Sequence, residues 1–114
     1  MYDKNNVFYK IMQNEIPSKK IYEDENVLAF YDINPMYKVH ALVISKKLCT
    51  DFDDFINSAT AKETADFFKS VSKVAGILDV KNSGYRILSN IGENANQIVK
   101  HFHVHILGGE KLRD

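Results

Sequence analysis

Alternating and helix-spaced hydrophobic positions predict one long helix and five strands. Apolar residues recur at helical spacing from Thr60 to Leu78, and Glu63 follows Thr60 by three residues in a capping-box pattern. Short apolar runs, bounded by polar or glycine-containing turns, are typical of strands. These runs predict strands at residues 20–23, 27–31, 39–45, 85–91 and 100–107.

A short amphipathic helix is predicted before the first strand. The asparagines at 5–6 can cap a helix whose apolar face holds Val7, Phe8 and Ile11. The Ile-Pro-Ser run at 16–18 ends it, because the residue before a proline is displaced from helical geometry. Three strands, a helix and two further strands favour an α+β fold: a five-stranded antiparallel sheet with one long and one short helix.

Composition narrows the class of protein. A length of 114 residues, 45% of them hydrophobic, predicts a single domain over residues 1–114 with its own core. Fifteen basic and fifteen acidic residues give zero net charge, which argues against binding nucleic acid or an anionic membrane. No apolar run approaches the ~20 residues that a membrane span needs, and residues 1–6 lack a signal-peptide core. We expect a cytoplasmic protein. The single cysteine, Cys49, precludes an intramolecular disulfide.

The candidate chemistry lies in the last predicted strand. Side chains of a strand alternate between its two faces, so His101, His103 and His105 are expected on one face, roughly 6.7 Å apart in succession. Three of the chain's four histidines therefore share one patch. The opposite face of this strand suits the core, with Phe102, Val104 and Ile106.

Three interpretations of the histidines compete. The simplest is a solvent-facing strand, although lysine or threonine would serve there equally well. Alternating histidines can also chelate zinc, copper or nickel, but no cysteine pair or neighbouring carboxylate in the sequence completes a site. The third is covalent catalysis, in which one neutral imidazole attacks an electrophile while its neighbours orient it and transfer protons.

The run His-Phe-His-Val-His-Ile-Leu at 101–107 resembles the signature of the histidine triad family. Leu-Gly-Gly at 107–109 is similar to the Hint branch of nucleoside phosphoramidate hydrolases rather than to the Fhit-like diadenosine polyphosphate hydrolases. The resemblance extends over nearly the whole chain. Further segments match in order at residues 8–11, 15–19, 30–35 and 40–44.

The resemblance implies catalytic roles for four histidines. His103, the middle residue of the triad, would be the nucleophile that attacks the α-phosphorus and forms a nucleotidyl-histidine intermediate. His105 would contact the α-phosphate and the leaving group, and as an imidazolium it could stabilise developing negative charge. His101 and His40 would orient the nucleophile and complete the proton network.

The same resemblance implies the substrate contacts. Asn90 and Gln97 would contact the phosphate, while Asn96 and Ile98 would supply loop backbone, since free amides can bind an anion without net charge. Asp32 would accept hydrogen bonds from the ribose, although on its own it is typical of a loop-capping aspartate. Six apolar residues would form the base pocket: Val7, Phe8, Ile11, Ile16, Phe30 and Ile33. Taken without the resemblance, such residues more often belong to the hydrophobic core.

Departures from the family pattern affect substrate preference. Ile98 stands where close relatives usually carry serine, so a hydroxyl hydrogen bond near the leaving group is lost. Asn96 replaces a usual glycine, and the sequence has no long tail after residues 108–109 to reach a partner's site. Asn6 and Tyr9 occupy positions where some microbial members carry zinc-binding cysteines, so we predict no structural zinc and no cofactor.

The resemblance favours a hydrolase acting on purine nucleoside phosphoramidates of the AMP–amine type. A dinucleoside polyphosphate hydrolase, and a nucleotide-binding or interaction module with little catalysis, are the alternatives. Hint-type proteins pair into a ten-stranded sheet, which implies a homodimer. Phe68 and Ala75 on the long helix, together with an open edge strand at 85–91, would offer the surface.

Overall fold

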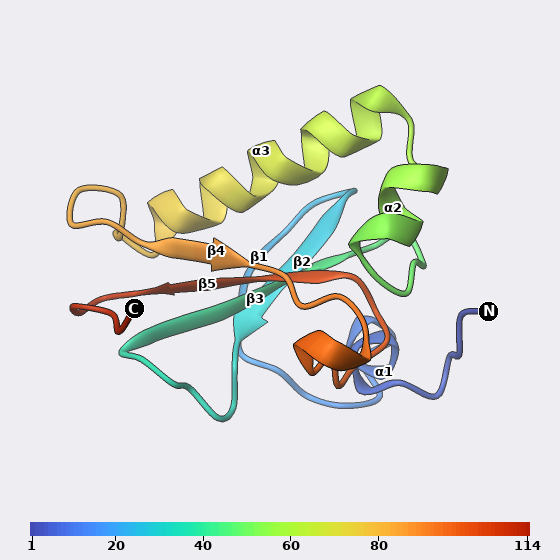
Figure 1. The fold of residues 1–114 in the computed structure, drawn as a ribbon, viewed down its shortest axis with the longest axis horizontal. Helices are drawn as coiled ribbons and strands as arrows, with labels where there is room; N and C mark the ends of the chain where they lie inside the picture. The colour runs from blue at the N-terminus through green and yellow to red at the C-terminus, as the bar shows by residue number, and fades with distance from the viewer.

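The computed structural model describes residues 1–114 and contains one five-stranded antiparallel sheet (Figure 1). The strand order is β1-β2-β3-β5-β4, so β5 lies inside the sheet while β1 and β4 form its edges. The α+β fold and the five-stranded sheet predicted from the sequence are confirmed. The strands are β1 (Lys20–Glu23), β2 (Val27–Tyr31), β3 (Val39–Ser45), β4 (Arg86–Leu88) and β5 (His103–Gly108).

Helices cover the two faces of the sheet unequally, as Figure 1 shows. The long helix α3 (Ala61–Ile77) lies over one face and is nearest to β1 and β2. The short helix α1 (Val7–Met12) packs on the other face. A second short helix, α2 (Phe52–Ser58), precedes α3, and a 3₁₀ turn, η1 (Glu93–Ala95), lies in the loop before β5.

Each face of the sheet has its own hydrophobic cluster. The cluster under α3 contains fourteen buried residues. They include Phe67 of the helix, Val104 and Ile106 of β5, and Phe102 just before β5. The cluster under α1 contains only six buried residues: Phe8, Ile11, Leu28, Phe30, Leu42 and Ile44. The sheet therefore has a fully covered face and a partly covered face.

Local signals account for how these elements begin. Thr60 caps α3 with a full capping box, because its hydroxyl accepts from Glu63 N while the Glu63 carboxylate accepts from Thr60 N. Asn6 caps α1, as its side-chain oxygen accepts from Tyr9 N at 2.9 Å. In the β1–β2 hairpin, one Asp24 carboxylate oxygen accepts from two turn amides.

Several boundaries differ from those predicted. The helix α1 ends at Met12, before the proline, because Asn14 adopts a left-handed conformation with φ 61°. The helix α2 was not predicted, although Asp51 caps it and Phe55 anchors it in the core. The pairing of β4 is confined to Arg86–Leu88 within the expected 85–91, and β5 begins at His103 rather than at residue 100.

The surface of α3 also differs in part from expectation. Ala75 is completely buried under the sheet, so it offers no surface to a partner. Phe68 is half-buried and packs edge-on against Phe67, with ring centroids 5.1 Å apart. None of the helices has the length and apolar character needed to cross a membrane.

Candidate active site

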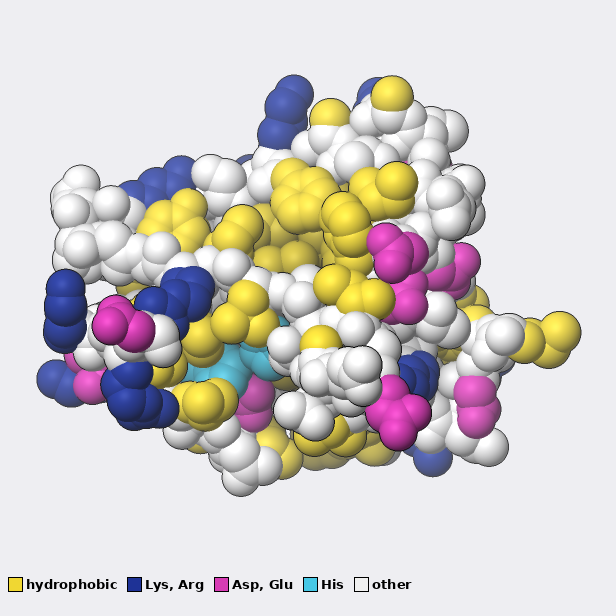
Figure 2. Space-filling view, in the orientation of Figure 1, with side chains coloured by type: hydrophobic (Ala, Val, Ile, Leu, Met, Phe, Trp, Pro, Cys, Tyr) yellow, Lys and Arg dark blue, Asp and Glu magenta, His cyan; other side chains and the backbone are white.

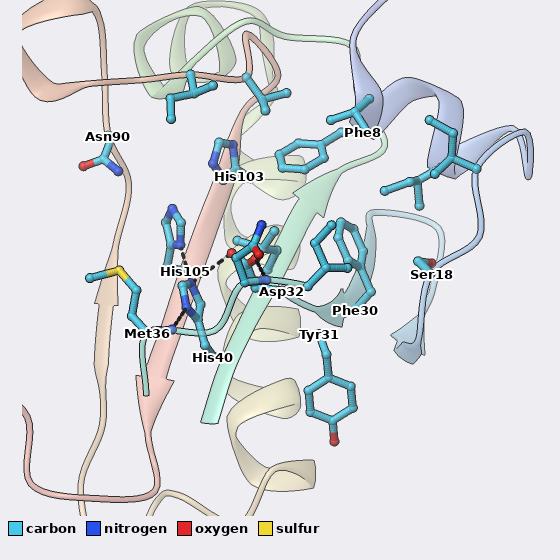
Figure 3. A pocket seen from close by; sticks show the side chains of 18 of the residues that line it. Phe8, Ser18, Phe30, Tyr31, Asp32, Met36, His40, Asn90, His103 and His105 are labelled. Atoms are coloured by element: carbon cyan, nitrogen blue, oxygen red, sulfur yellow. Dashed lines mark hydrogen bonds and ion pairs between the residues drawn. The ribbon is translucent and has the colours of Figure 1, made fainter. Parts of the chain in front are cut away.

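The partly covered face of the sheet carries a cavity of about 420 Å³ beside α1. This volume lies in the usual range for small-molecule sites. His40 of β3 and both His103 and His105 of β5 line it (Figure 3). In the space-filling view, histidine side chains are visible in a hollow bordered by hydrophobic side chains (Figure 2).

Sheet register brings the three pocket histidines together. His103 and His105 lie two residues apart on β5 and therefore point to the same face. His105 is paired with Leu42, and His40 lies two residues before Leu42 on the antiparallel strand β3, diagonal to His105. The rings of His103 and His105 have centroids 5.2 Å apart, as do those of His40 and His105.

His103 is held in one tautomer. Its Nδ1 lies 2.6 Å from the backbone carbonyl oxygen of His101, and a carbonyl can only accept, so Nδ1 carries the proton. The Nε2 atom of the neutral ring therefore keeps a free lone pair on the side chain that lines the cavity. Phe8 packs edge-on against this ring at 4.8 Å. The arrangement orients an unprotonated ring nitrogen as a nucleophile requires.

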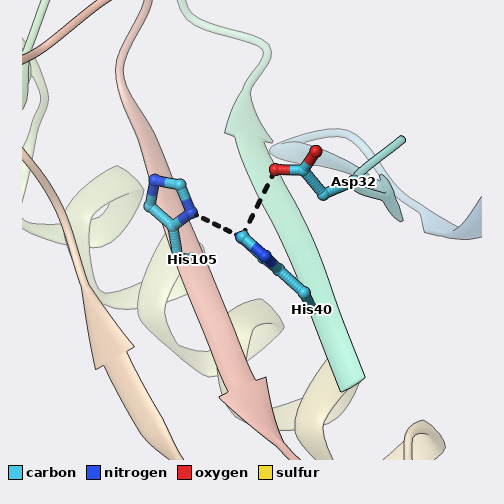
Figure 4. A group of neighbouring side chains, drawn as sticks. All are labelled: Asp32, His40 and His105. Atoms are coloured by element: carbon cyan, nitrogen blue, oxygen red, sulfur yellow. Dashed lines mark hydrogen bonds and ion pairs between the residues drawn. The ribbon is translucent and has the colours of Figure 1, made fainter. Parts of the chain in front are cut away.

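A second chain of hydrogen bonds fixes the tautomers of His40 and His105 (Figure 4). The backbone N–H of Met36 donates to His40 Nδ1 at 3.0 Å, so His40 carries its proton on Nε2. From Nε2 this proton faces His105 Nδ1 at 3.0 Å and an Asp32 carboxylate oxygen at 3.3 Å. His105 thus accepts at Nδ1 and keeps an Nε2–H donor. Asp32 also accepts from Asn34 N, as a loop-capping aspartate does.

The ligand atoms of Asp32, His40 and His105 lie within 4.8 Å of one another, a spacing that one metal ion could bridge. The carboxylate that the sequence did not place near the histidines is therefore present. However, a metal on His40 Nε2 would require the ring proton to move to Nδ1, where it would face the N–H of Met36. This donor set fits a hydrogen-bonded cluster better than it fits a metal.

Burial keeps the histidines of the site neutral. Loss of solvation lowers the pKa of His103 and of His40, and lowers the pKa of His105 to about 4. The nearby histidines His103 and His40 add to the effect on His105, while Asp32 opposes it. In the protein without substrate, desolvation at His105 outweighs the Asp32 carboxylate and disfavours the imidazolium form.

His101 does not line the cavity, although its ring packs edge-on against Phe8 with centroids 6.1 Å apart, on the same side of the sheet as His103. His101 precedes β5, outside regular strand geometry, and its ring is completely buried. Its Nε2 donates to the carbonyl oxygen of Ser45 at 2.7 Å, and its Nδ1 bonds the hydroxyl of Tyr2. Strand alternation could not have indicated Tyr2, since 99 residues separate it from His101.

The loop between β4 and β5 forms another wall, with Asn90, Asn96, Gln97 and Ile98 all lining the cavity. Asn96 adopts the left-handed conformation with φ 60° that its side chain tolerates. The Gln97 amide is fully engaged by the protein: its oxygen accepts from Gly92 N, and its nitrogen donates to the carbonyls of Val99 in the loop and of Thr50 outside it. Gln97 thus shapes the loop.

Free donors remain on this loop. The backbone N–H groups of Ile98 and Val99 donate no hydrogen bond within the protein, whereas that of Asn96 is bonded to Glu93 O. The side chain of Asn90 makes no hydrogen bond to the protein and points toward the space beside His103 and His105 (Figure 3). Unpaired donors on a cavity wall suit an anion.

Apolar side chains form another wall of the cavity, and Val99 of the loop packs against them. Phe8 and Phe30 pack edge-on with centroids 5.8 Å apart, and both are buried. All six residues expected to form an apolar pocket line the cavity: Val7, Phe8, Ile11, Ile16, Phe30 and Ile33. Lining residues that sequence reasoning missed are Pro17, Ser18, Tyr31, Asn34, Met36, Leu42 and Val99. Their side chains carry no distinctive chemistry, so only the fold could place them there.

The residues near α1 do not fit a zinc site. Asn6 is engaged as the helix cap and donates to the Tyr2 hydroxyl at 2.9 Å. The ring of Tyr9 packs edge-on against Tyr2 at 6.2 Å. An amide and a phenol at these positions are poor substitutes for the thiolates that structural zinc prefers.

Comparisons with known proteins agree with this geometry. The HIT domain family profile matches residues 13–112. An uncharacterized 13.2 kDa HIT-like protein from Azospirillum brasilense is 50% identical over 111 residues, covering 97% of this chain and 91% of that protein. A histidine triad protein from Clostridium difficile has a TM-score of 0.86 at 38% identity, covering 100% and 98% of the two chains. A HIT family hydrolase from Clostridium thermocellum has a TM-score of 0.85, also at 38% identity, covering 98% and 96%.

Proposed function

This chain belongs to the HIT family, and from that premise we propose that it is a Hint-like nucleotide hydrolase that cleaves the P–N bond of purine nucleoside phosphoramidates. The observation that carries the proposal is the tautomer of His103. Its Nδ1–H is bonded to the backbone, which leaves a neutral Nε2 at the wall of a cavity large enough for a nucleotide. The similar protein from Clostridium thermocellum is described as a HIT family hydrolase.

The proposed orientation of the substrate follows the chemistry of the walls. The apolar wall lined by Phe8 and Phe30 suits a planar base, because base and aromatic rings both bury apolar faces. Asp32, beside this wall, offers a carboxylate to the ribose hydroxyls. The α-phosphate then lies against the free N–H groups of Ile98 and Val99, close to the histidines.

In the first step, His103 Nε2 forms a bond to the α-phosphorus while the bond from phosphorus to the amine nitrogen breaks. The bound anion favours an additional proton on the pair His40–His105, because nearby negative charge stabilises the charged form. The leaving nitrogen takes this proton through His105 and departs as an amine.

In the second step, water attacks the phosphorus of the nucleotidyl-His103 intermediate. The water returns a proton to the pair His40–His105, and the bond from phosphorus to His103 breaks. Throughout both steps the backbone carbonyl of His101 holds the Nδ1 proton of His103, so the ring nitrogen that leaves phosphorus regains its lone pair. The product is the nucleoside monophosphate.

Replacing the nucleophile tests the proposal. The His103→Ala variant should lose at least about 10⁴-fold in kcat on an adenosine phosphoramidate, a scale typical for removal of a nucleophile that acts in a concerted site. AMP binding and thermal unfolding serve as controls that the cavity persists. Wild-type turnover in this variant would exclude the mechanism. A wild-type protein that hydrolyses only a dinucleoside polyphosphate, or binds AMP without turnover, would favour one of the two alternatives.

We also propose a homodimer formed across β4. This strand is an open edge of the sheet, and α3 lies nearest the opposite edge strand. Hydrophobic side chains gather between α3 and β4 on the surface in Figure 2. Tyr85, Ile87 and Ile91 are exposed along this segment, with Ile87 at 48%. By contrast, the β1 edge carries the ion pair Lys20–Glu23, which discourages pairing. Sedimentation at micromolar concentration should give twice the mass of one chain; a single-chain species contradicts the dimer.

A further inference from the structure

Hydrogen bonds on both sides of His101 connect the N-terminal segment to His103, with the covalent frame of His101 between them. The Asn6 side-chain nitrogen donates to the Tyr2 hydroxyl at 2.9 Å, and this hydroxyl is bonded to Nδ1 of His101. The other ring nitrogen of His101 donates to Ser45 O at 2.7 Å. The backbone carbonyl of His101 in turn accepts the Nδ1 proton of His103 at 2.6 Å.

The direction of each of these hydrogen bonds is determined. Asn6 Oδ1 accepts from Tyr9 N, so the atom near Tyr2 is the amide nitrogen, which only donates. Ser45 O only accepts, so the proton of His101 lies on Nε2 and its Nδ1 has a lone pair. The Tyr2 hydroxyl must therefore donate to His101. Burial raises the pKa of Tyr2, which keeps that hydroxyl proton in place.

The contacts also show that Tyr2 is the group that secures the buried ring. His101 is fully enclosed, and Tyr2 lies edge-on to it with centroids 5.5 Å apart. Without the hydroxyl, Nδ1 of a buried imidazole would have no partner, a costly arrangement that the ring relieves by moving or by admitting water. A moved ring takes the backbone carbonyl of His101 with it, and that carbonyl fixes the tautomer of His103.

We propose that Tyr2 is a positioning residue for the nucleophile, acting through His101 on the Nδ1–H of His103. This inference rests on the proposed function for its kinetic consequences, but the coupling itself is structural. Tyr2 does not line the cavity, so it has no route to contact the substrate. Its effect is therefore expected on kcat rather than on KM.

The test removes the hydroxyl alone with Tyr2→Phe. We expect kcat on an adenosine phosphoramidate to fall by about tenfold, the scale of one lost hydrogen bond to a buried group, with KM unchanged within about twofold. The matched control is Tyr9→Phe, because Tyr9 lies beside Tyr2 but its hydroxyl makes no hydrogen bond. This control should retain wild-type kcat and KM.

A second variant, Asn6→Asp, keeps both the helix cap and the Tyr2 ring. The carboxylate that it introduces can only accept, so it draws the Tyr2 proton away from His101. It should therefore reproduce the loss of kcat seen with Tyr2→Phe in protein that remains folded, although it also removes the 2.8 Å hydrogen bond from the Asn6 side chain to Asp3 O. A role of Tyr2 in packing alone predicts no effect of this substitution on kcat.

Proton NMR gives a readout that needs no substrate. The hydrogen-bonded Nδ1 proton of His103 should give a resolved downfield signal in the wild type and in Tyr9→Phe. In Tyr2→Phe and Asn6→Asp the signal should weaken through exchange or disappear. An unchanged signal in both variants overturns the proposal, even if the protein hydrolyses no phosphoramidate. A lost signal without any phosphoramidate turnover in the wild type would instead refute only the proposed function.

Discussion

The two faces of the sheet use the same strand for different purposes. Toward α3, Val104 and Ile106 join a cluster of fourteen buried residues. Partly buried side chains such as Ile21 and Tyr22 pack against this cluster. Toward α1, His103 and His105 meet a cluster of only six residues and border a cavity. One face is packed to exclude water, whereas the other leaves space for a ligand.

This difference shows how a small domain supports a reactive site. The well-packed face holds β5 in the centre of the sheet, paired on both sides with β3 and β4. Because period-two alternation is rigid, fixing Val104 on one face also fixes His103 and His105 on the other. The chemical groups therefore require few stabilising contacts of their own, and stability and activity should respond to different residues of the same strand.

The largest expected change in stability comes from replacing Phe102, which precedes the nucleophile in sequence but faces the packed side of the sheet. Phe102→Ala removes a fully buried ring that packs on Phe67 and Phe55. It should lower the free energy of unfolding by about 3–5 kcal/mol. The folded fraction should keep most of its kcat, in contrast to His103→Ala. Urea unfolding measures the first quantity, and a loss below about 1 kcal/mol would show that the packed face does not dominate stability.

An intermediate effect is expected from pH. Burial lowers the pKa of His101 and His105 to about 4 in the folded protein, below the value of about 6.5 in the unfolded chain. Between these pH values the unfolded chain binds more protons than the folded protein. The contribution of the neutral histidines to the free energy of unfolding is therefore fully present above pH 6.5 and falls as the pH drops toward 4. The loss from pH 7 to pH 5 should be about 2 kcal/mol for each of these two histidines, given ~1.4 kcal/mol for each pH unit and proton.

The same measurement separates the two faces. The packed face holds the thiol of Cys49, whose pKa is raised by burial, and the hydroxyl of Tyr22, whose pKa is raised by its hydrogen bond to Asp24; neither titrates in this interval. The dependence should therefore come from the histidine face, and His105→Asn should reduce it by about half in urea unfolding at pH 5 and pH 7, since His101 keeps its share. Equal slopes for the wild type and this variant would contradict the assignment.

The smallest expected effect lies at the rim of the open face. Ile98 is 90% exposed, so Ile98→Ser should change stability by less than about 0.5 kcal/mol. The hydroxyl that it introduces can bond the leaving group, and we expect kcat/KM on an adenosine phosphoramidate to rise by less than about tenfold. A decrease in kcat/KM would show that the isoleucine itself contributes to substrate binding.

Periodicity predicted the elements whose two faces differ most. The helix from Thr60 and the alternation from Phe102 to Ile106 were both correct, because a buried face imposes a repeating pattern. The same rule misplaced the start of this strand, which begins at His103 rather than at residue 100, although the His101 ring still packs against Phe8 on the α1 side. Regular pairing begins only at His103 because the N–H of Phe102 donates to the carbonyl of Cys49. This is a contact between distant parts of the chain.

For the site, the sequence indicated which side chains come together but not how their hydrogen bonds are arranged. The pocket histidines and Asp32 come together as the resemblance implied. Their tautomers depend on the N–H of Met36 and on the carbonyl of His101, and no local pattern specifies such contacts. The helix α2 was missed because its seven residues are too short for helical periodicity to stand out, despite the cap at Asp51.

The stereochemistry at phosphorus tests the central claim most directly. If His103 Nε2 attacks the α-phosphorus and water then displaces it, two in-line displacements occur. A phosphoramidate made chiral at phosphorus by isotopic or sulfur substitution, hydrolysed in labelled water, should give a monophosphate with retained configuration. Inverted configuration would mean that water attacks the substrate directly and that His103 does not form the covalent intermediate.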